Sequence, residues 1–220
     1  MKTMNVLIAQ AMTLTVALST HAQTFTNLNF EQAHPNPDTP GLVTAASAFP
    51  DWTVSIDGIQ QTQVYYNVTS TGATQVALVS ASSLDFTALD GNYSALLEGL
   101  VPGSVASISQ TGLIPAGTQS LFFEANGDAD SFELFVGTIA VPFAAIGAGP
   151  NYFIYGANIS TWADDTEQIT FSDFGGSPNI WEIDDISFSP TSIAPEPSII
   201  ALTAIGGMLF GARKSFARRF

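Results

Sequence analysis

The chain has 220 residues, of which 46% are hydrophobic and only 11% charged; this composition excludes a disordered protein and suits about one domain. It contains no cysteine, which excludes disulfides and thiolate-bound zinc or iron–sulfur centres. Residues 23–194 hold 18 of the 19 acidic residues and neither Lys nor Arg, so the sequence excludes binding to a phosphate backbone and predicts a surface that attracts cations. The five basic residues lie near the two ends, at Lys2, Arg213, Lys214, Arg218 and Arg219.

The N-terminus has the three parts of a secretory signal peptide. Lys2 is followed by an apolar run from Val6 to Leu18 and by small residues that end at Ala22. This order predicts a signal peptide over residues 1–22 with cleavage after Ala22, in preference to a buried first helix. The mature chain then begins at Gln23 and folds outside the cytoplasm.

Short alternating or β-branched runs, separated by Gly, Pro, Asn and Asp, fill residues 23–190. No stretch keeps helical spacing for long, so the pattern predicts an all-β sandwich over residues 23–190. The predicted strands are 24–31, 52–56, 63–68, 75–79, 93–98, 104–110, 119–125, 131–136, 167–173 and 181–188.

The mature chain shows no catalytic motif. His34 is its only histidine, and no Gly-x-Ser-x-Gly elbow occurs, so a Ser-His-Asp triad is not expected. Two carboxylates are enough to hydrolyse a glycoside, but no spacing marks such a pair here. We therefore expect a protein that is not an enzyme, with a glycoside-active enzyme as an alternative.

Several sequence runs appear in the order of a known fold. They are N-F-E at 29–31, D-G-N-Y-S-A-L-L-E at 90–98, S-I-S-Q-T-G-L-I-P-A-G-T-Q-S-L-F-F-E-A at 107–125 and I-D-D-I-S-F-S at 183–189. Over most of Phe25–Ser189 the chain resembles the galactose-binding-like jelly roll of many carbohydrate-binding modules. The resemblance implies a jelly-roll β-sandwich that binds polysaccharide.

In that fold the first and last strands often lie together and share a structural calcium ion, which implies Glu31, Asp184 and Asp185 as ligands. Calcium takes several oxygen ligands, and adjacent carboxylates repel unless a cation lies between them. In a regular strand Asp184 and Asp185 point to opposite faces, so both contribute only if a bulge intervenes. The alternative is two solvated edge carboxylates. A second acidic run, 127–133, lacks the spacing of a complete calcium loop and predicts a solvated turn.

Exposed aromatic rings could form a platform for the apolar face of a sugar. The candidates are Tyr65, Tyr66, Tyr93, Tyr152, Tyr155 and Trp162. Most of the 16 Phe residues, together with Trp52 and Trp181, are expected in the core.

The C-terminus has three parts: Pro195-Glu196-Pro197 in a linker over 191–197, an uncharged apolar segment over 198–212, and a basic tail over 213–220. The prolines keep the linker extended, and the apolar segment has about the minimum length of a transmembrane helix. The positive-inside tendency places the tail in the cytoplasm.

This order resembles the bacterial PEP-CTERM sorting signal, which an exosortase recognises and which is linked to extracellular polysaccharide. The resemblance implies that Pro195, Glu196 and Pro197 are the recognition motif. It implies a retention tail made of Arg213, Lys214, Arg218 and Arg219. A simple single-span anchor is the alternative.

The sequence thus predicts an exported protein of the cell envelope or extracellular matrix, transiently anchored in the membrane and sorted by exosortase. Its domain is expected to bind polysaccharide, with calcium as a structural cofactor and no nucleic-acid partner. A structural matrix or adhesion protein without discrete sugar affinity is the other alternative.

Overall fold

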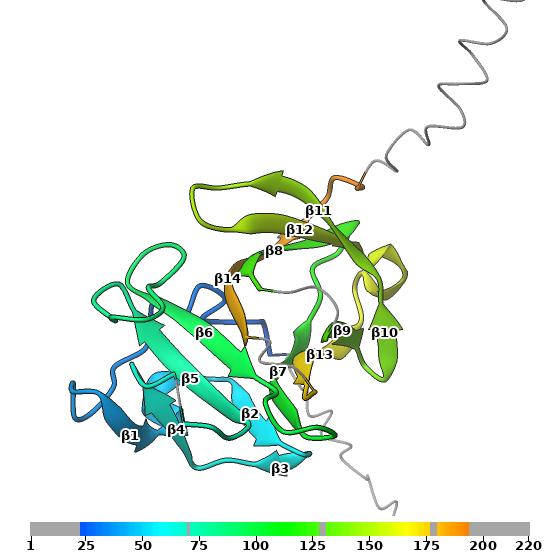
Figure 1. The fold of residues 1–220 in the computed structure, drawn as a ribbon. Helices are drawn as coiled ribbons and strands as arrows, with labels where there is room; N and C mark the ends of the chain where they lie inside the picture. The colour runs from blue at the N-terminus through cyan, green and yellow to red at the C-terminus, as the bar shows by residue number, and fades with distance from the viewer. Residues whose placement is uncertain (1–22, 70, 128–130, 177–179, 194–220) are drawn as a thin grey trace, which may run out of the picture.

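The computed structural model describes residues 23–69, 71–127, 131–176 and 180–193, which form two β-sheets packed face to face (Figure 1). The predicted all-β sandwich is confirmed. The larger sheet has eight strands in the order β1-β4-β5-β6-β14-β8-β12-β11. The smaller has six, in the order β10-β9-β13-β7-β2-β3. The pairing of β4 with β5 is parallel, whereas the other described strand pairs are antiparallel.

The eight-stranded sheet comprises β1 (Gly41–Thr44), β4 (Gln63–Tyr66), β5 (Gln75–Ser80), β6 (Tyr93–Glu98), β14 (Ile180–Ser189), β8 (Ser120–Asn126), β12 (Phe153–Asn158) and β11 (Phe143–Ala148). The six-stranded sheet comprises β10 (Ile139–Val141), β9 (Phe132–Val136), β13 (Thr166–Phe174), β7 (Val105–Leu113), β2 (Thr53–Ile56) and β3 (Ile59–Gln60). Two short helical turns are α1 (Ala45–Ala48) and η1 (Ser160–Trp162). Each strand predicted from residue 52 onward coincides with an observed strand, within a few residues at its ends.

The strand predicted at 24–31 is wrong. Asn27 and Phe30 have φ angles of 50° and 56°, in the left-handed region, and such angles interrupt a β-ladder. The Asn27 side chain instead donates a hydrogen bond to the carbonyl of Pro50 at 3.1 Å. Phe30 is completely buried, with its ring centroid 5.6 Å from that of Trp52. The segment therefore does not extend a sheet, and its Phe30 side chain packs into the hydrophobic core.

The two ends of the chain lie outside the described residues. These ends include the predicted signal peptide (1–22), the Pro-Glu-Pro motif, the apolar segment 198–212 and the basic tail. Part of the acidic run 127–133, at 128–130, also lies outside them. Within the part of the chain that the structure describes, no helix has the length and apolar content needed to cross a membrane.

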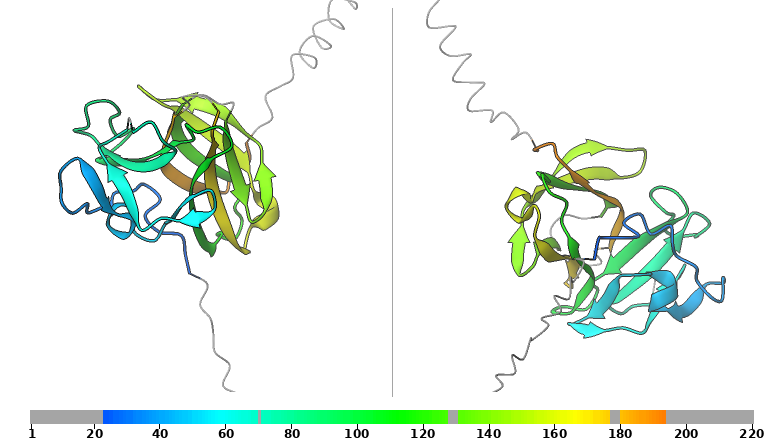
Figure 2. Two further views of the ribbon diagram at one scale, coloured as in Figure 1. Left: turned by 60° about the horizontal axis from the view of Figure 1, so that its bottom comes forward. Right: turned by 180° about the vertical axis from the view of Figure 1, so that it is seen from behind.

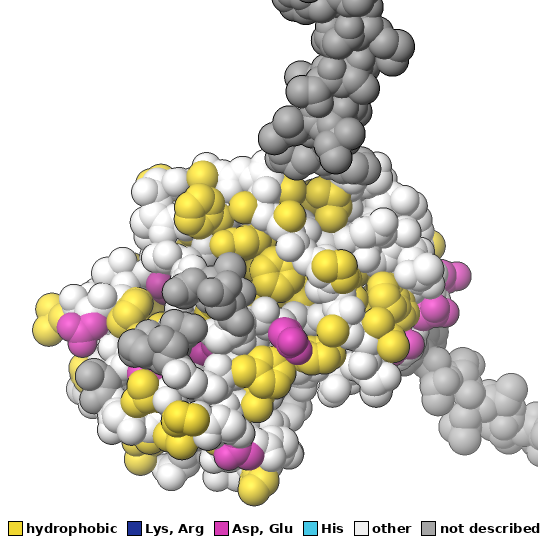
Figure 3. Space-filling view, turned by 45° about the vertical axis from the view of Figure 1, so that its right-hand side comes forward, with side chains coloured by type: hydrophobic (Ala, Val, Ile, Leu, Met, Phe, Trp, Pro, Cys, Tyr) yellow, Lys and Arg dark blue, Asp and Glu magenta, His cyan; other side chains and the backbone are white. Residues whose placement is uncertain are grey.

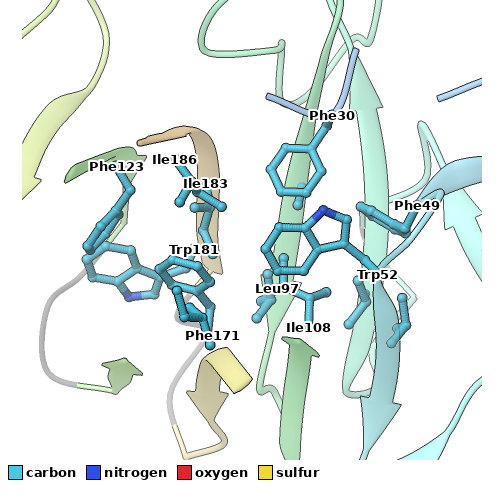
Figure 4. Packing of buried hydrophobic residues seen from close by; sticks show 14 of the residues in the cluster. Phe30, Phe49, Trp52, Leu97, Ile108, Phe123, Phe171, Trp181, Ile183 and Ile186 are labelled. Carbon is cyan, nitrogen blue, oxygen red and sulfur yellow. The ribbon is translucent and has the colours of Figure 1, made fainter. Parts of the chain in front are cut away.

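The core lies between the two sheets as one contiguous hydrophobic cluster. Figure 4 shows Trp52 with Phe30 and Phe49 in one part of it, and Trp181 with Phe123 in the other. Both tryptophans are buried, as predicted. The buried residues of this cluster lie between residues 30 and 186, so a fragment of residues 23–193 keeps all of them.

The outer face of the eight-stranded sheet is partly covered by the loop between β5 and β6. Phe86 from this loop packs on a second, smaller cluster formed by Ala77, Val79 and Leu96. Figures 1 and 2 show this loop beside the tip of the β11–β12 hairpin. In the sheet, β14 lies between β6, which follows the loop, and β8, which pairs with β12. Side chains on the outer face of β14 and β8 are therefore flanked by two loops.

Candidate functional site

Carboxylates lie on the outer face of the eight-stranded sheet at its centre. In β14, Trp181 and Ile183 point into the core, so Glu182 and Asp184 point to the opposite face. Glu124 of β8 lies directly opposite Asp184 in the ladder. We call Glu124, Glu182 and Asp184 the acidic cluster.

A β-bulge follows Asp184. The pairing of β14 with β8 shifts its register between Asp184 and Ser187, and Asp185 has a φ angle of 45°. This is the condition under which both aspartates could act from one side of the strand. Asp184 is buried and Asp185 is exposed, so the two carboxylates are in different environments.

Asp184 is held by three hydrogen-bond donors. Its Oδ2 accepts from the Ser94 hydroxyl at 2.7 Å and from the Asp90 backbone N–H at 3.4 Å. Its Oδ1 accepts from the Asp185 backbone N–H at 2.8 Å. Burial nevertheless raises the pKa of Asp184 to about 7, because these bonds offset only part of the loss of hydration.

Fewer hydrogen bonds offset the loss of hydration at Glu182 than at Asp184. Only 2% of the residue is exposed, and its Oε1 has no hydrogen-bond partner. Burial, and then the charge of Asp184, raise the pKa of Glu182 to about 8, against a smaller opposing effect of Ser94. Since residues 23–193 contain no Lys or Arg, no side-chain cation in the described part neutralises the pair. Near pH 7 the pair holds at least one proton.

Glu124 connects the cluster to the β11–β12 hairpin. The Tyr152 hydroxyl donates a hydrogen bond to the Glu124 carboxylate, which raises the pKa of Tyr152. Burial is the main cause that raises the pKa of Glu124, and its Oε2 is buried without a partner. Tyr152 itself is only half-buried, so it lies between the cluster and solvent.

Apolar groups adjoin these carboxylates on the same face. Phe122 lies two residues before Glu124 in β8, and Ile154 of β12 is the ladder partner of Glu124. Both side chains are half-buried, and Phe122 is paired with Gly156, which has no side chain to cover it. The site thus combines hydrogen-bond acceptors with an apolar strip of Phe122 and Ile154.

Two other buried carboxylates, unlike Glu124 and Glu182, have no buried oxygen without a hydrogen-bond partner. Asp173 accepts from the Gly99 backbone N–H at 2.7 Å and from the Ser131 hydroxyl at 2.6 Å. Glu98 accepts from the Gln75 side-chain amide at 2.6 Å. These bonds tie strands and turns together, which accounts for Asp173 and Glu98 as structural residues.

Glu31 serves as a cap in this structure. Its Oε1 accepts from the backbone N–H groups of Asn92 and Tyr93 at 2.6 and 3.0 Å, and its Oε2 accepts from the Asn92 side chain at 2.7 Å. Burial raises the pKa of Glu31, but the three hydrogen bonds outweigh it and the pKa is lowered overall. Glu31 thereby fixes the end of the β5–β6 loop that leads into β6.

The predicted calcium ligands are neighbours but do not form a complete donor set. The charge of Glu31 contributes to raising the pKa of Asp185, after burial and the charge of Asp90, so these groups lie within electrostatic range. Among the described residues, however, no group of three or more His, Asp or Glu side chains converges on one point as metal ligands must. The oxygens of Glu31 and Asp184 are occupied by N–H and O–H donors. Calcium binding therefore stays a prediction of the resemblance.

The predicted aromatic platform does not form on one face. Tyr66 and Tyr155 are buried, with 4% and 8% of each residue exposed, so their assignment to an exposed platform is wrong. Tyr65 packs on the small outer cluster, and Trp162 packs against the main core. Of the candidates, Tyr152 alone is hydrogen-bonded to the acidic cluster within the described residues.

No family model matches the chain, and no curated protein matches it. Several solved structures are similar to it in fold. TmCBM61, solved in complex with beta-1,4-galactotriose, is 17% identical, with 76% of this chain and 97% of that chain covered and a TM-score of 0.39. The K2 cleaved adhesin domain of Lys-gingipain is 14% identical, with 73% and 96% covered and a TM-score of 0.46. The family 11 carbohydrate-binding module from Clostridium thermocellum is 8% identical, with 70% and 98% covered and a TM-score of 0.38.

Proposed function

We propose that the domain is a non-catalytic polysaccharide-binding module and that Glu124, Tyr152 and the apolar strip form its binding surface. One observation carries the proposal: the half-buried side chains of Glu124, Tyr152 and the apolar strip lie together on the outer face, so a hydrogen-bond acceptor, a phenol ring and apolar groups adjoin at the boundary with solvent. Glu182 and Asp184 lie buried beneath them. Sugar hydroxyls are donors that carboxylate oxygens accept well, and the C–H faces of a sugar ring pack on apolar side chains.

The charge of the domain restricts the ligand. A surface with no Lys or Arg repels polyanions at low ionic strength, so uronic-acid polymers are disfavoured. Neutral polysaccharides and those with amino sugars suit the surface. Tyr152, at the hairpin tip, is placed to add its ring to the contact once a ligand replaces its hydrogen bond to Glu124.

The proposal for the whole protein includes export and sorting by exosortase to the cell envelope or extracellular matrix. It rests on the terminal sequence motifs. The test expresses the full chain in a host with and without exosortase and follows its processed size and its location. Replacement of Pro195, Glu196 and Pro197 by Ala should leave the chain in the membrane fraction, and equal processing of both forms would refute this part.

Binding is tested on purified residues 23–193 by affinity electrophoresis in gels that contain neutral, amino-sugar or uronic-acid polysaccharides. We expect retardation on a neutral or amino-sugar polymer, and loss of most of it in Glu124→Gln and in Tyr152→Ala. Glu167→Gln, which removes the same charge from β13 in the other sheet, is the matched control. No retardation on any polymer would refute the binding proposal.

Two further experiments test the calcium prediction and the enzymatic alternative. Electrophoresis with added calcium or chelator tests calcium binding: retardation that a chelator abolishes, and that is also lost in Glu31→Gln, would support a calcium site. An assay for new reducing ends tests the enzymatic alternative, which the raised pKa of Glu182 beside Asp184 favours over any other carboxylate pair described. Turnover that disappears in Glu182→Gln would replace the binding-module proposal with a glycoside hydrolase.

A further inference from the structure

The two sheets end on the same side of the sandwich, and among the described residues no further strand pairs with either end there. β11 is the last strand of the eight-stranded sheet and β10 the last of the six-stranded sheet. Between them a groove of about 680 Å³ is lined by residues that include Phe132, Leu134, Val141, Phe143 and Tyr155. Figure 3 shows hydrophobic side chains across this side of the molecule. We call β10, β11 and the groove between them the open edge.

Edge strands normally carry charges or Pro to prevent pairing with another chain. β11 reads F-A-A-I-G-A, and five of its six residues are exposed. Pro142 precedes the strand and a bulge lies between Ala145 and Gly147, so the unprotected part is short and begins at Phe143. No strand in the described ranges pairs with the outer side of β11, so the backbone donors and acceptors on that side are available to another strand.

Charge is absent over a long stretch around this edge. From Leu134 to Ala163 the chain contains no Asp, Glu, Lys, Arg or His, whereas the whole chain has a formal net charge of -14. Glu133 of β9, which directly precedes this stretch, is the acidic residue that lines the groove. Exposed apolar side chains at the open edge include Ile139 of β10 and Ile146 of β11, at 56% and 44% exposure. Such a patch marks an interaction surface.

We propose that the open edge is a dimer interface at which β11 pairs antiparallel with β11 of a second copy. Two copies of this acidic domain repel each other wherever carboxylates face carboxylates. Because a two-fold axis brings each patch against itself, only an uncharged patch allows close approach of two such copies. The groove beside β11 can receive an apolar side chain of the partner copy.

The salt dependence identifies this kind of interface. Salt screens the residual repulsion between the two acidic domains, so added NaCl strengthens the dimer. An interface whose formation charge repulsion does not oppose would not strengthen in this way. Sedimentation velocity of residues 23–193 at about 1–100 µM, in about 20 mM and about 500 mM NaCl, measures both the mass and its dependence on salt.

Ala145→Glu tests the location, because Ala145 is exposed on β11 and lines the groove. It places a carboxylate on both sides of the two-fold axis, and we expect the dimer dissociation constant to rise by at least about tenfold. Ala116→Glu, in the exposed turn between β7 and β8, makes the same change away from the edge and should leave the dimer unchanged. Thermal unfolding verifies that both variants fold; if Ala145→Glu does not, Ala144→Glu on the same strand replaces it.

Each other outcome overturns the proposal. A monomer at every concentration and salt would show that the edge is not a self-association surface. A dimer that persists in both Ala145→Glu and Ala144→Glu would place the interface elsewhere. A dimer that added salt dissociates would show that repulsion between the acidic domains does not limit its formation, and a mass increase seen only after addition of polysaccharide would assign the edge to a glycan.

Discussion

The buried position of Glu182 leads to a quantitative prediction for the variant Glu182→Gln. The pKa of Glu182 is raised from 4.5 to about 8, so between these pH values the unfolded chain loses a proton that the folded chain keeps. The stability contribution is therefore fully present below pH 4.5 and is lost as the pH rises through about 8. The loss is about 1.4 kcal/mol per pH unit, which gives a total of about 5 kcal/mol. Gln has the same shape and no charge to bury, so the variant avoids this loss.

Urea unfolding from pH 4.5 to 8.5, followed by the fluorescence of the buried Trp52 and Trp181, measures the effect. We expect wild type and Glu182→Gln to be nearly equal at the acid end, and the variant to be more stable by about 2–5 kcal/mol at the alkaline end. Glu167→Gln removes the same charge from a different sheet and controls for the general relief of repulsion. The same pH dependence in wild type and Glu182→Gln would refute the argument, since it would mean that Glu182 ionises as easily in the folded chain as in the unfolded one.

Three other predictions concern the surroundings of the cluster and the core. Ser94→Ala removes the donor to Asp184 and leaves the Leu89 backbone N–H without its acceptor, so unfolding should cost about 2–4 kcal/mol less; a loss below about 1 kcal/mol would contradict it. Gly91→Ala places a Cβ against Glu31 Oε1 at a φ of +57°, so its melting temperature should fall, whereas an unchanged melting temperature would show that the loop adapts freely. Trp181→Ala creates a core cavity and should cost about 3–5 kcal/mol in urea unfolding; a cost under about 2 kcal/mol would mean that the core collapses around it.

Sequence reasoning found strands with alternating polarity and also continuous apolar runs bounded by turn residues, such as β5 and β6. In β14, Trp181 and Ile183 alternate with Glu182 and Asp184, and this pattern states both the strand and its buried face. β11 gives no such signal, because its residues are apolar or small throughout and it lies at a sheet edge, where neither face is fully buried. The segment 24–31 alternates like a strand, but its backbone leaves the extended region at Asn27 and Phe30.

The candidate site was only partly predictable for a different reason. Asp184 was found through the Asp184-Asp185 pair, and Glu182 could have been found from its position two residues before Asp184 on the same face. Glu124 could not, because its place beside Asp184 depends on the register between β8 and β14, which are distant in the sequence. The lack of a partner for Glu182 Oε1 depends on packing around the whole cluster, so no local pattern reveals it.

The dimer interface and the glycan surface, proposed separately, meet in one geometric consequence. An antiparallel β11–β11 pair has its two-fold axis perpendicular to the sheet, so both acidic clusters face the same side of one continuous sheet. Across the dimer the strands follow in the order β8, β12, β11 of one copy and then β11, β12, β8 of the other. The two β8 strands, which carry Glu124, are therefore five strand spacings apart, or about 24 Å measured across the strands. A long polysaccharide can reach both sites, whereas an oligosaccharide shorter than this span can reach only one.

Ala145→Glu should therefore weaken binding of the long polymer by about tenfold or more while leaving the affinity for a short oligosaccharide of the same sugar unchanged. Isothermal titration with both ligands, on wild type and on the variant, separates the two effects. Equal losses for polymer and oligosaccharide would mean that Ala145 disturbs the binding surface itself. Equal retention of both would mean that each domain binds its glycan independently of the open edge.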